Sequence, residues 1–176
     1  MKTSIASEFA RPVQSALSFR TLTAGQVQSS LLSFYLGLGF DARRARFGGA
    51  VSDHSIRRHC RHLDPDRSIV FACSGPSGLI AAIELHPLSS DWEDCELAHA
   101  ECATVDRTTI VAHLLQLAAF AAGERGCATF IIPCWTPEHG MLELLRGMGR
   151  VRVHGDAVRV ELGEYASLHG RSDSRL

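Results

Sequence analysis

A helix pattern enclosed by two strand patterns, in the second half of the chain, restricts the fold more than any other feature of the sequence. Cys95–Val105 and Ala128–Pro133 are predicted strands, and the longest predicted helix, Thr108–Ala122, lies between them. The helix is followed by Gly123 and Gly126, and glycine readily adopts the left-handed conformation that ends a helix. A strand–helix–strand unit of this kind joins two parallel strands of one sheet. The chain is therefore expected to contain at least one parallel strand pair.

The remaining elements surround this unit with antiparallel strands. The predicted order is β-α-α-β-β-β-α-β-α-β-β, in which a meander of strands leads into the parallel unit and a hairpin follows it. This order indicates an α/β fold with a mixed sheet (α+β) and excludes doubly wound folds, where strands and helices alternate throughout. The other predicted strands are Ser18–Thr23, Ser68–Cys73, Gly78–Leu85, Val151–His154 and Val158–Leu162, and the other predicted helices are Val27–Leu38, a helix capped by Ser52 or Asp53 that runs to about Leu63, and Pro137–Met148.

Length and composition are those of one globular domain. The 176 residues, 45% hydrophobic and 21% charged, are enough to bury a core without a disulfide or a metal ion. We expect the domain to span residues 17–165, with flexible segments at 1–16 and 166–176. A net charge of -1 provides no broad electrostatic attraction to nucleic acid or to a membrane. The longest apolar stretch, Ile110–Ala122, is too short to span a bilayer and Met1–Ser18 has no continuous apolar core, so a cytoplasmic protein with reduced cysteines is expected.

Four segments resemble the GNAT superfamily of acyl-CoA-dependent N-acetyltransferases, in particular a bacterial branch of it. Arg43–Asp64 (RRARFGGAVSDHSIRRHCRHLD) is similar to the helix-loop-helix region of that branch, and Ser74–Leu88 (SGPSGLIAAIELHPL) is similar to the family's hairpin. Ala112–Cys134 (AHLLQLAAFAAGERGCATFIIPC) is similar to the central helix and the strand after it, and Met141–Gly149 (MLELLRGMG) to the last helix. The resemblance covers residues 18–163 and implies a GNAT-like fold, with helices flanking a central mixed sheet.

The resemblance also implies an activity: an acetyl or other acyl group passes from acyl-CoA to an amine by direct attack in a ternary complex. In the family, the fourth and fifth strands splay apart around the pantetheine arm. The pyrophosphate lies on N–H groups at the start of the central helix, where unpaired donors and the helix dipole favour anions. Acetyl-CoA is thus the expected co-substrate and a small-molecule or protein amine the expected acceptor, with no metal, nucleic acid or membrane partner, and a homodimer stays open. Carried onto this chain, the coenzyme-binding residues are Cys102, Ala103, Thr104, Arg107, Thr108, Thr109, Ile110, Val111, Ala112 and His113.

The predicted coenzyme loop departs from the family pattern. Aligned without gaps, the glycine-containing loop becomes Asp106–Val111, with Thr109 and Val111 at the glycine positions. Helical backbone N–H groups need no glycine, and Arg107 can reach the phosphates directly. Leu145 stands near the place of a tyrosine that often serves as general acid. Three interpretations therefore remain open: an active N-acyltransferase, a GNAT-like module that has lost catalysis and binds a ligand or partner, and an unrelated α/β fold whose two strands do not splay.

Three titratable side chains in the fourth predicted strand are candidates for the general base. Glu96 occupies a place where many GNAT relatives carry a glutamate, and partial burial would raise its pKa, as deprotonation of an amine requires. The alternative for Glu96 is a solvent-facing strand residue. His99 and Glu101 share one face of the strand and Glu96 lies on the other, because side chains alternate along a strand. Only a bulge in the strand would bring both sets to one cleft.

His54, His59 and His62, together with Cys60, form a dense cluster on the second predicted helix. A zinc site needs closer pairs that converge from two elements, and the sequence contains no Cys-x-x-Cys motif. An exposed helix rich in arginine and histidine is the favoured interpretation. Cys102 has no evident charged partner that would lower its pKa, so it is interpreted as a packing residue and not as a nucleophile.

Overall fold

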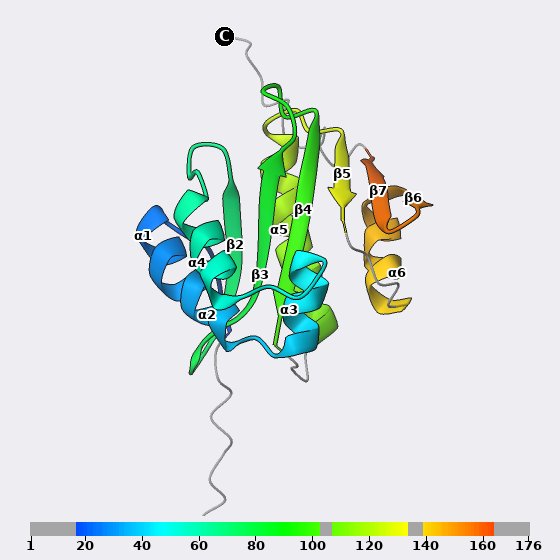
Figure 1. Ribbon diagram of the computed structural model, residues 1–176. Coiled ribbons are helices and arrows are strands. Elements are labelled where there is room, and N and C mark those ends of the chain that lie inside the picture. The colour runs from blue at the N-terminus through cyan, green and yellow to red at the C-terminus, as the bar shows by residue number, and fades with distance from the viewer. Residues whose placement is uncertain (1–16, 103–106, 134–138, 164–176) are drawn as a thin grey trace, which may run out of the picture.

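Figure 1 shows the computed structural model, which describes residues 17–102, 107–133 and 139–163. Within these residues a seven-stranded sheet has the order β1-β2-β3-β4-β5-β7-β6, and every neighbouring pair is antiparallel except β4–β5. The strands are β1 (Ser18–Thr21), β2 (Ile69–Gly75), β3 (Gly78–Pro87), β4 (Asp94–Glu101), β5 (Thr129–Ile132), β6 (Gly149–His154) and β7 (Ala157–Leu162). The helical segments are α1 (Ala24–Gln26), the π-helical η1 (Val27–Leu31), α2 (Leu32–Gly37), α3 (Phe40–Phe47), α4 (Asp53–His62), α5 (Arg107–Gly123) and α6 (His139–Met148).

Local chemistry explains where the helices over the front face begin and end. The Ser52 hydroxyl caps α4 by accepting a hydrogen bond from the Ser55 N–H group. The preceding helix, α3, ends at Gly48, whose φ of 73° lies in the left-handed region that glycine adopts without strain. These two boundaries turn the chain between α3 and α4, so that both helices lie against the same face of the sheet (Figure 1).

Two apolar clusters hold helices to the two faces of the sheet. The segments α1 to α4 cover one face, while α5 and α6 cover the other (Figure 1). The front cluster includes Leu31, Tyr35, Ile56, Cys60, Ala82 and Ala100. The rear cluster includes Ile83, Leu97, Leu114, Leu115, Phe130 and Leu145. Burial of these side chains, about 1.5–3 kcal/mol for each large one, supplies most of the force that packs the layers together.

The pairing between β4 and β5 is short, and the two strands separate beyond it. The parallel register joins Asp94 to Thr129 and ends where Glu96 meets Ile131. β4 then continues to Glu101, still paired with β3, while Ile132 at the end of β5 pairs with β7. In Figure 1 the ribbons of β4 and β5 move apart toward the end of the sheet where α5 begins. An α/β fold in which these strands stay paired throughout is therefore excluded.

Most predicted elements are confirmed, with shifts of a few residues at their ends. One helix was missed: α3 does not occur in the order derived from the sequence, although Arg43–Asp64 resembles a helix-loop-helix region. The first helix begins at Ala24 and not at Val27, because Thr23 forms a capping box with Gln26. The end of the predicted strand Cys95–Val105, like segments 1–16 and 166–176, lies outside the described residues. No helix of the described part of the chain could cross a lipid bilayer.

Candidate functional site

A cleft lies on the front face, between α4 and the paired ends of β3 and β4. Its volume is about 910 Å³. Most of the residues that line it are polar and many carry imidazole or guanidinium groups, unlike the apolar clusters that pack the two layers. Side chains that matter for its chemistry come from α4, from the segment before β2, and from β3 and β4: Arg58, His59, His62, Ser68, His86 and Glu96.

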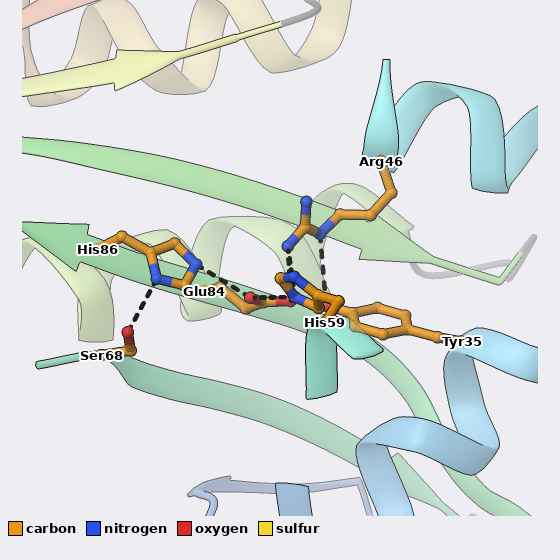
Figure 2. A network of polar contacts seen from close by, with 6 residues as sticks. All are labelled: Tyr35, Arg46, His59, Ser68, Glu84 and His86. Atoms are coloured by element: carbon orange, nitrogen blue, oxygen red, sulfur yellow. Dashed lines mark hydrogen bonds and ion pairs between the residues drawn. The ribbon is translucent and has the colours of Figure 1, made fainter. Parts of the chain in front are cut away.

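A buried carboxylate lies behind two residues of the cleft lining, His59 and His86. Glu84 of β3 has 0% exposure and stands among apolar strand neighbours. Figure 2 shows four side chains converging on it from α2, α3, α4 and β3. Arg46 Nη2 lies 2.6 Å from Glu84 Oε1, and the Tyr35 hydroxyl donates a short hydrogen bond to the same oxygen. His59 Nε2 and His86 Nε2 each lie 2.9 Å from Glu84 Oε2.

These contacts fix the charge of the buried group. Burial alone would raise the pKa of the Glu84 carboxyl, but the Arg46 guanidinium and the two histidine hydrogen bonds outweigh burial and hold the pKa well below its usual range. The carboxylate in turn raises the pKa of Arg46 against the effect of burial. Burial and the Glu84 charge raise the pKa of Tyr35 well above its usual value, so the phenol stays protonated. The network contains an ionised Glu84, a charged Arg46 and a neutral Tyr35.

The hydrogen bonds also orient the two imidazole rings. An ionised carboxylate can only accept, so the Nε2 atoms of His59 and His86 carry hydrogen and donate to Glu84. His86 Nδ1, on the other side of the ring, lies 2.9 Å from Ser68 Oγ. A line of hydrogen bonds therefore runs from Ser68 through His86 to Glu84 (Figure 2).

Glu96 reaches the same cleft from β4. Its register partner across the β3–β4 ladder is His86, and Ala98 stands opposite Glu84, so these residues share one face of the sheet. Glu96 is half-buried and lines the cleft. The structure thus brings the leading sequence candidate for a general base next to a network that the sequence analysis did not identify.

His99 and Glu101 lie on the opposite face of β4, toward α5. The register between β3 and β4 is uninterrupted from Cys95 to Glu101, so no bulge within this stretch brings them to the side of Glu96. His99 Nε2 is buried, lies 3.6 Å from Glu101 Oε2 and has no hydrogen-bond partner among the described residues. Glu96 therefore faces the α4 side of the sheet, and His99 and Glu101 face the α5 side.

An ion pair joins Glu101 to the start of α5. Arg107 Nε contacts Glu101 Oε1, and Glu101 is mostly buried, with a side-chain exposure of 13%. Burial acts to raise the pKa of Glu101, but His99 and Arg107 together lower it, so the carboxyl is ionised at neutral pH. The predicted phosphate-binding arginine is thus held at the start of α5 by an acid from β4.

The predicted coenzyme-binding residues at the start of α5 divide into exposed and buried groups. Thr108 and Thr109 are exposed, whereas Ile110 and Val111 point into the rear core and can offer only backbone atoms to a ligand. Ala112 is half-buried, and the exposed His113 packs its ring on Phe19 with centroids 4.1 Å apart. The predicted contacts Ala103 and Thr104 lie outside the described residues. Cys102 is half-buried, and burial followed by the charge of Glu101 raises its pKa, which does not suit a nucleophilic thiol.

The histidine-rich helix α4 differs from its predicted description in one respect. His54 and His62 are exposed, as expected, but His59 turns inward onto Glu84 and Cys60 is buried. Burial and the Glu84 charge raise the pKa of the Cys60 thiol to about 11. Among the described residues, no group of three side chains is arranged to hold a metal ion. The expectation of a fully solvated helix was wrong for His59, because a buried carboxylate 25 residues further along the chain supplies it with a partner.

Comparison with solved structures identifies the fold. The GNAT domain of S. lividans PAT is 19% identical and superposes with a TM-score of 0.65, covering 82% of this chain and 88% of that domain. An aminoglycoside 6'-acetyltransferase type Ii is 14% identical with a TM-score of 0.60, covering 82% of this chain and 96% of that one. The chain has the GNAT fold. A third GNAT-fold relative, the PaiA N-acetyltransferase of Thermoplasma acidophilum solved with coenzyme A, is 13% identical, covers 83% of this chain and 99% of its own, and has a TM-score of 0.55.

The GNAT fold predicted from sequence segments is thereby confirmed. Neither a protein-family model nor a curated protein sequence matches the chain. Identities of 13–19% establish a shared arrangement of helices and strands and leave the substrate to be argued from the site itself. Within the GNAT fold, the separation of β4 and β5 and the start of α5 lie where the sequence resemblance places the coenzyme.

The residues around Glu84 were not predicted from the sequence. One local signal was available: Glu84 stands in the apolar run LIAAIEL of a predicted strand, and a carboxylate in such a run needs a partner. No local pattern identifies that partner. Arg46 lies on a helix that the sequence analysis did not predict, and Tyr35 and His59 occupy two further helices.

Proposed function

We propose that this chain is an acyl-CoA-dependent N-acyltransferase that transfers an acetyl or related acyl group to an amine. The observation that carries the proposal is the divergence of β4 from β5 beyond Glu96, in a GNAT fold, at the end of the sheet where α5 begins. A gap between two strands exposes backbone groups that an extended amide-bearing arm can pair with. The pantetheine arm of coenzyme A has that chemistry, and a GNAT-fold relative was solved with coenzyme A.

The start of α5 is the proposed pyrophosphate site. Backbone N–H groups of the first turn have no partner within a helix and favour an anion. Of the two residues at the family's glycine positions, Val111 turns its side chain into the core and so leaves the outer side of the backbone open, whereas the side chain of Thr109 is exposed. Arg107 provides the positive charge, and bound phosphate would compete with Glu101 for it.

Glu96 is the proposed general base. The amine nitrogen attacks the thioester carbonyl carbon, the carbon–sulfur bond breaks, and coenzyme A leaves as a thiolate that takes up a proton. Glu96 would receive the proton that the amine loses, directly or through water, because it lines the cleft on the α4 side of β4. The acceptor would then occupy the cleft beside α4, opposite the coenzyme.

Calorimetric titration with acetyl-CoA tests the coenzyme site. Replacing Arg107 with alanine removes a charge-assisted contact worth about 1.5–3 kcal/mol, which corresponds to roughly 10- to 100-fold weaker binding. Arg125→Ala is the matched control, because Arg125 lies at the other end of α5 and donates to the Ala121 carbonyl. Glu101→Gln should bind acetyl-CoA more tightly than the unmodified chain, since it weakens the ion pair with Arg107 and removes a negative charge.

Steady-state assays with a panel of small amines and amine-bearing peptides test the reaction. Glu96→Gln should lower kcat by about 10²–10⁴-fold while leaving acetyl-CoA affinity unchanged. If no heat is detected for a chain whose fold is verified by circular dichroism, the enzyme proposal is wrong. A GNAT-like module that binds another ligand or a partner would then be the remaining interpretation.

A further inference from the structure

A line of hydrogen bonds connects the buried Glu84 with a hydroxyl at the cleft. Ser68 Oγ lies 2.9 Å from His86 Nδ1, and His86 Nε2 lies 2.9 Å from Glu84 Oε2 (Figure 2). Ser68 and His86 both line the 910 Å³ cleft, whereas Glu84 is fully buried behind them. A hydroxyl, an imidazole and a buried carboxylate in this order form the arrangement that activates a serine for nucleophilic attack.

The hydrogen-bond donors and acceptors of Ser68, His86 and Glu84 are arranged in the order that activation of a serine requires. Glu84 is ionised and can only accept, so the His86 Nε2–H group donates to it, and Nδ1 on the other side of the ring lies 2.9 Å from Ser68 Oγ. In the tautomer that carries its hydrogen on Nε2 alone, His86 accepts the Ser68 hydroxyl proton at Nδ1. When the serine loses its proton to Nδ1, the resulting imidazolium is stabilised by the carboxylate on its other side.

Compensation of the buried charge does not account for Ser68. Arg46, Tyr35 and His59 already contact both oxygens of Glu84. Ser68 contacts His86 and no oxygen of Glu84 among the described hydrogen bonds. Its presence adds a hydroxyl at the cleft surface and not a counter-charge in the core.

The backbone holds Ser68 and His86 together. Ile69 pairs with Leu85 at the edge of the β2–β3 ladder, and one further step in this antiparallel register brings Ser68 beside His86. The Ser68 N–H group donates to the Asp64 carbonyl at 2.8 Å, which closes the turn before β2. The hydroxyl and the imidazole are therefore positioned by the sheet and the adjoining turn.

We propose that Ser68 is a nucleophile toward small activated carboxylic esters and thioesters, with His86 as its base and Glu84 as the residue that positions His86. Ser68 Oγ bonds to the carbonyl carbon as its proton passes to His86 Nδ1. The carbon–oxygen or carbon–sulfur bond of the leaving group breaks, and His86 returns the proton to the departing alcohol or thiol. Water then hydrolyses the acyl-serine ester by the same route. Arg58 and Arg67 line the cleft and supply positive charge for the tetrahedral oxyanion.

Reaction with p-nitrophenyl acetate tests the proposal without coenzyme or amine. Rapid mixing should give a burst of p-nitrophenol equal to the protein concentration, and mass spectrometry of the acid-quenched protein should place one acetyl group on Ser68. Ser55 is the internal comparison, because it lines the same cleft but its hydroxyl lies 3.1 Å from that of Ser52. It should remain unlabelled.

Substitutions separate nucleophile, base and scaffold. Ser68→Ala should abolish the burst, Ser68→Cys should restore it, and Ser89→Ala, outside the cleft lining, should leave it unchanged. His86→Gln should slow acylation by about 10²-fold or more. A Glu84→Gln/Arg46→Met double variant keeps the buried pair neutral, and should acylate at least about tenfold more slowly while its circular dichroism spectrum stays that of a folded chain.

The proposal is wrong if the burst is absent from the folded chain, if Ser68→Ala retains it, or if the acetyl group is found on another residue. Ser68 lies at the cleft surface, so its variants test the proposal even if His86→Gln does not fold. The outcome is independent of the proposed acyl-CoA activity: an absent burst leaves acetyl-CoA binding untouched, and an absent calorimetric signal leaves the serine chemistry intact.

Discussion

Replacing Arg46 with methionine isolates the energetic role of the buried network. Arg46 and Glu84 are 2.6 Å apart, with side-chain exposures of 6% and 0%. Methionine keeps most of the length and apolar contact of the arginine stem but removes its charge. The variant leaves an ionised carboxylate in the core with the remaining donors Tyr35, His59 and His86.

The expected loss of stability follows from burial. Breaking a buried ion pair by removal of one partner costs about 3–5 kcal/mol, and the donors that remain on Glu84 favour the lower end of this range. For a chain of this size, 1 kcal/mol corresponds to a change in Tm of roughly 2–4 °C, so a fall of roughly 6–12 °C is expected. Chemical denaturation, with the midpoint and slope fitted together, measures the free energy of unfolding.

The chain contains a matched control for this substitution. Arg146 and Glu143 of α6 also lie 2.6 Å apart, but their side-chain exposures are 57% and 72%. Arg146→Met should cost no more than about 0.5 kcal/mol, because solvent screens an exposed pair. The two ion pairs thus have the same nitrogen–oxygen distance and differ in how deeply they are buried.

The pH dependence of the Arg46→Met penalty provides a second readout. Without the guanidinium, burial raises the pKa of Glu84, and the carboxyl takes up a proton more readily. The loss in free energy of unfolding caused by Arg46→Met should therefore be smaller at pH 5 than at pH 8. Equal losses for Arg46→Met and Arg146→Met, or a penalty that does not change with pH, would refute the conclusion that Glu84 is an ionised core residue held by Arg46.

Three further substitutions or measurements test individual features. Gly149→Ala should destabilise the chain by about 1–3 kcal/mol in denaturant titrations, because an added Cβ would lie 2.0 Å from the Glu161 carbonyl oxygen, while Gly140→Ala, which meets nothing within 4 Å, should not. Burial and a neighbouring carboxylate raise the pKa of Tyr35, so its contribution to the free energy of unfolding is present below about pH 10 and is lost above it. Tyr35→Phe should therefore reduce the fall in the free energy of unfolding at alkaline pH. The raised pKa of Cys102 predicts alkylation slower than that of a free cysteine peptide at pH 7.5, measured by mass spectrometry, and a faster rate in the folded chain would contradict it.

Local sequence patterns were sufficient for the architecture. The strand–helix–strand unit around α5 and the two hairpins were predicted from periodicity and turn residues, since the hydrophobic spacing of a helix or a strand depends on its own residues. The helix α3 was missed because it has no fully buried apolar residue: Ala42 and Phe47 are only partly buried, and the side chain that it does bury, Arg46, is charged. The GNAT fold could be inferred because the segments that resemble the family, and their order along the chain, can be read directly from the sequence.

Part of the candidate site was also open to prediction. Alternation along a strand separated Glu96 from His99 and Glu101, and the uninterrupted β3–β4 register agrees with that separation. The roles proposed for these three residues remain predictions.

The sequence by itself thus determined the order of the strands, the main helices other than α3, the fold and the two faces of β4. The tertiary structure alone decided what surrounds Glu84 and which hydroxyl faces His86. Helices α2, α3 and α4 and strand β3 bring Tyr35, Arg46 and His59 to one carboxylate from positions up to 49 residues away. No sequence periodicity predicts these contacts, because they depend on how the packed layers place side chains in three dimensions. Burial then strengthens the contacts, which keep Glu84 ionised and orient the hydrogen bonds of the histidines.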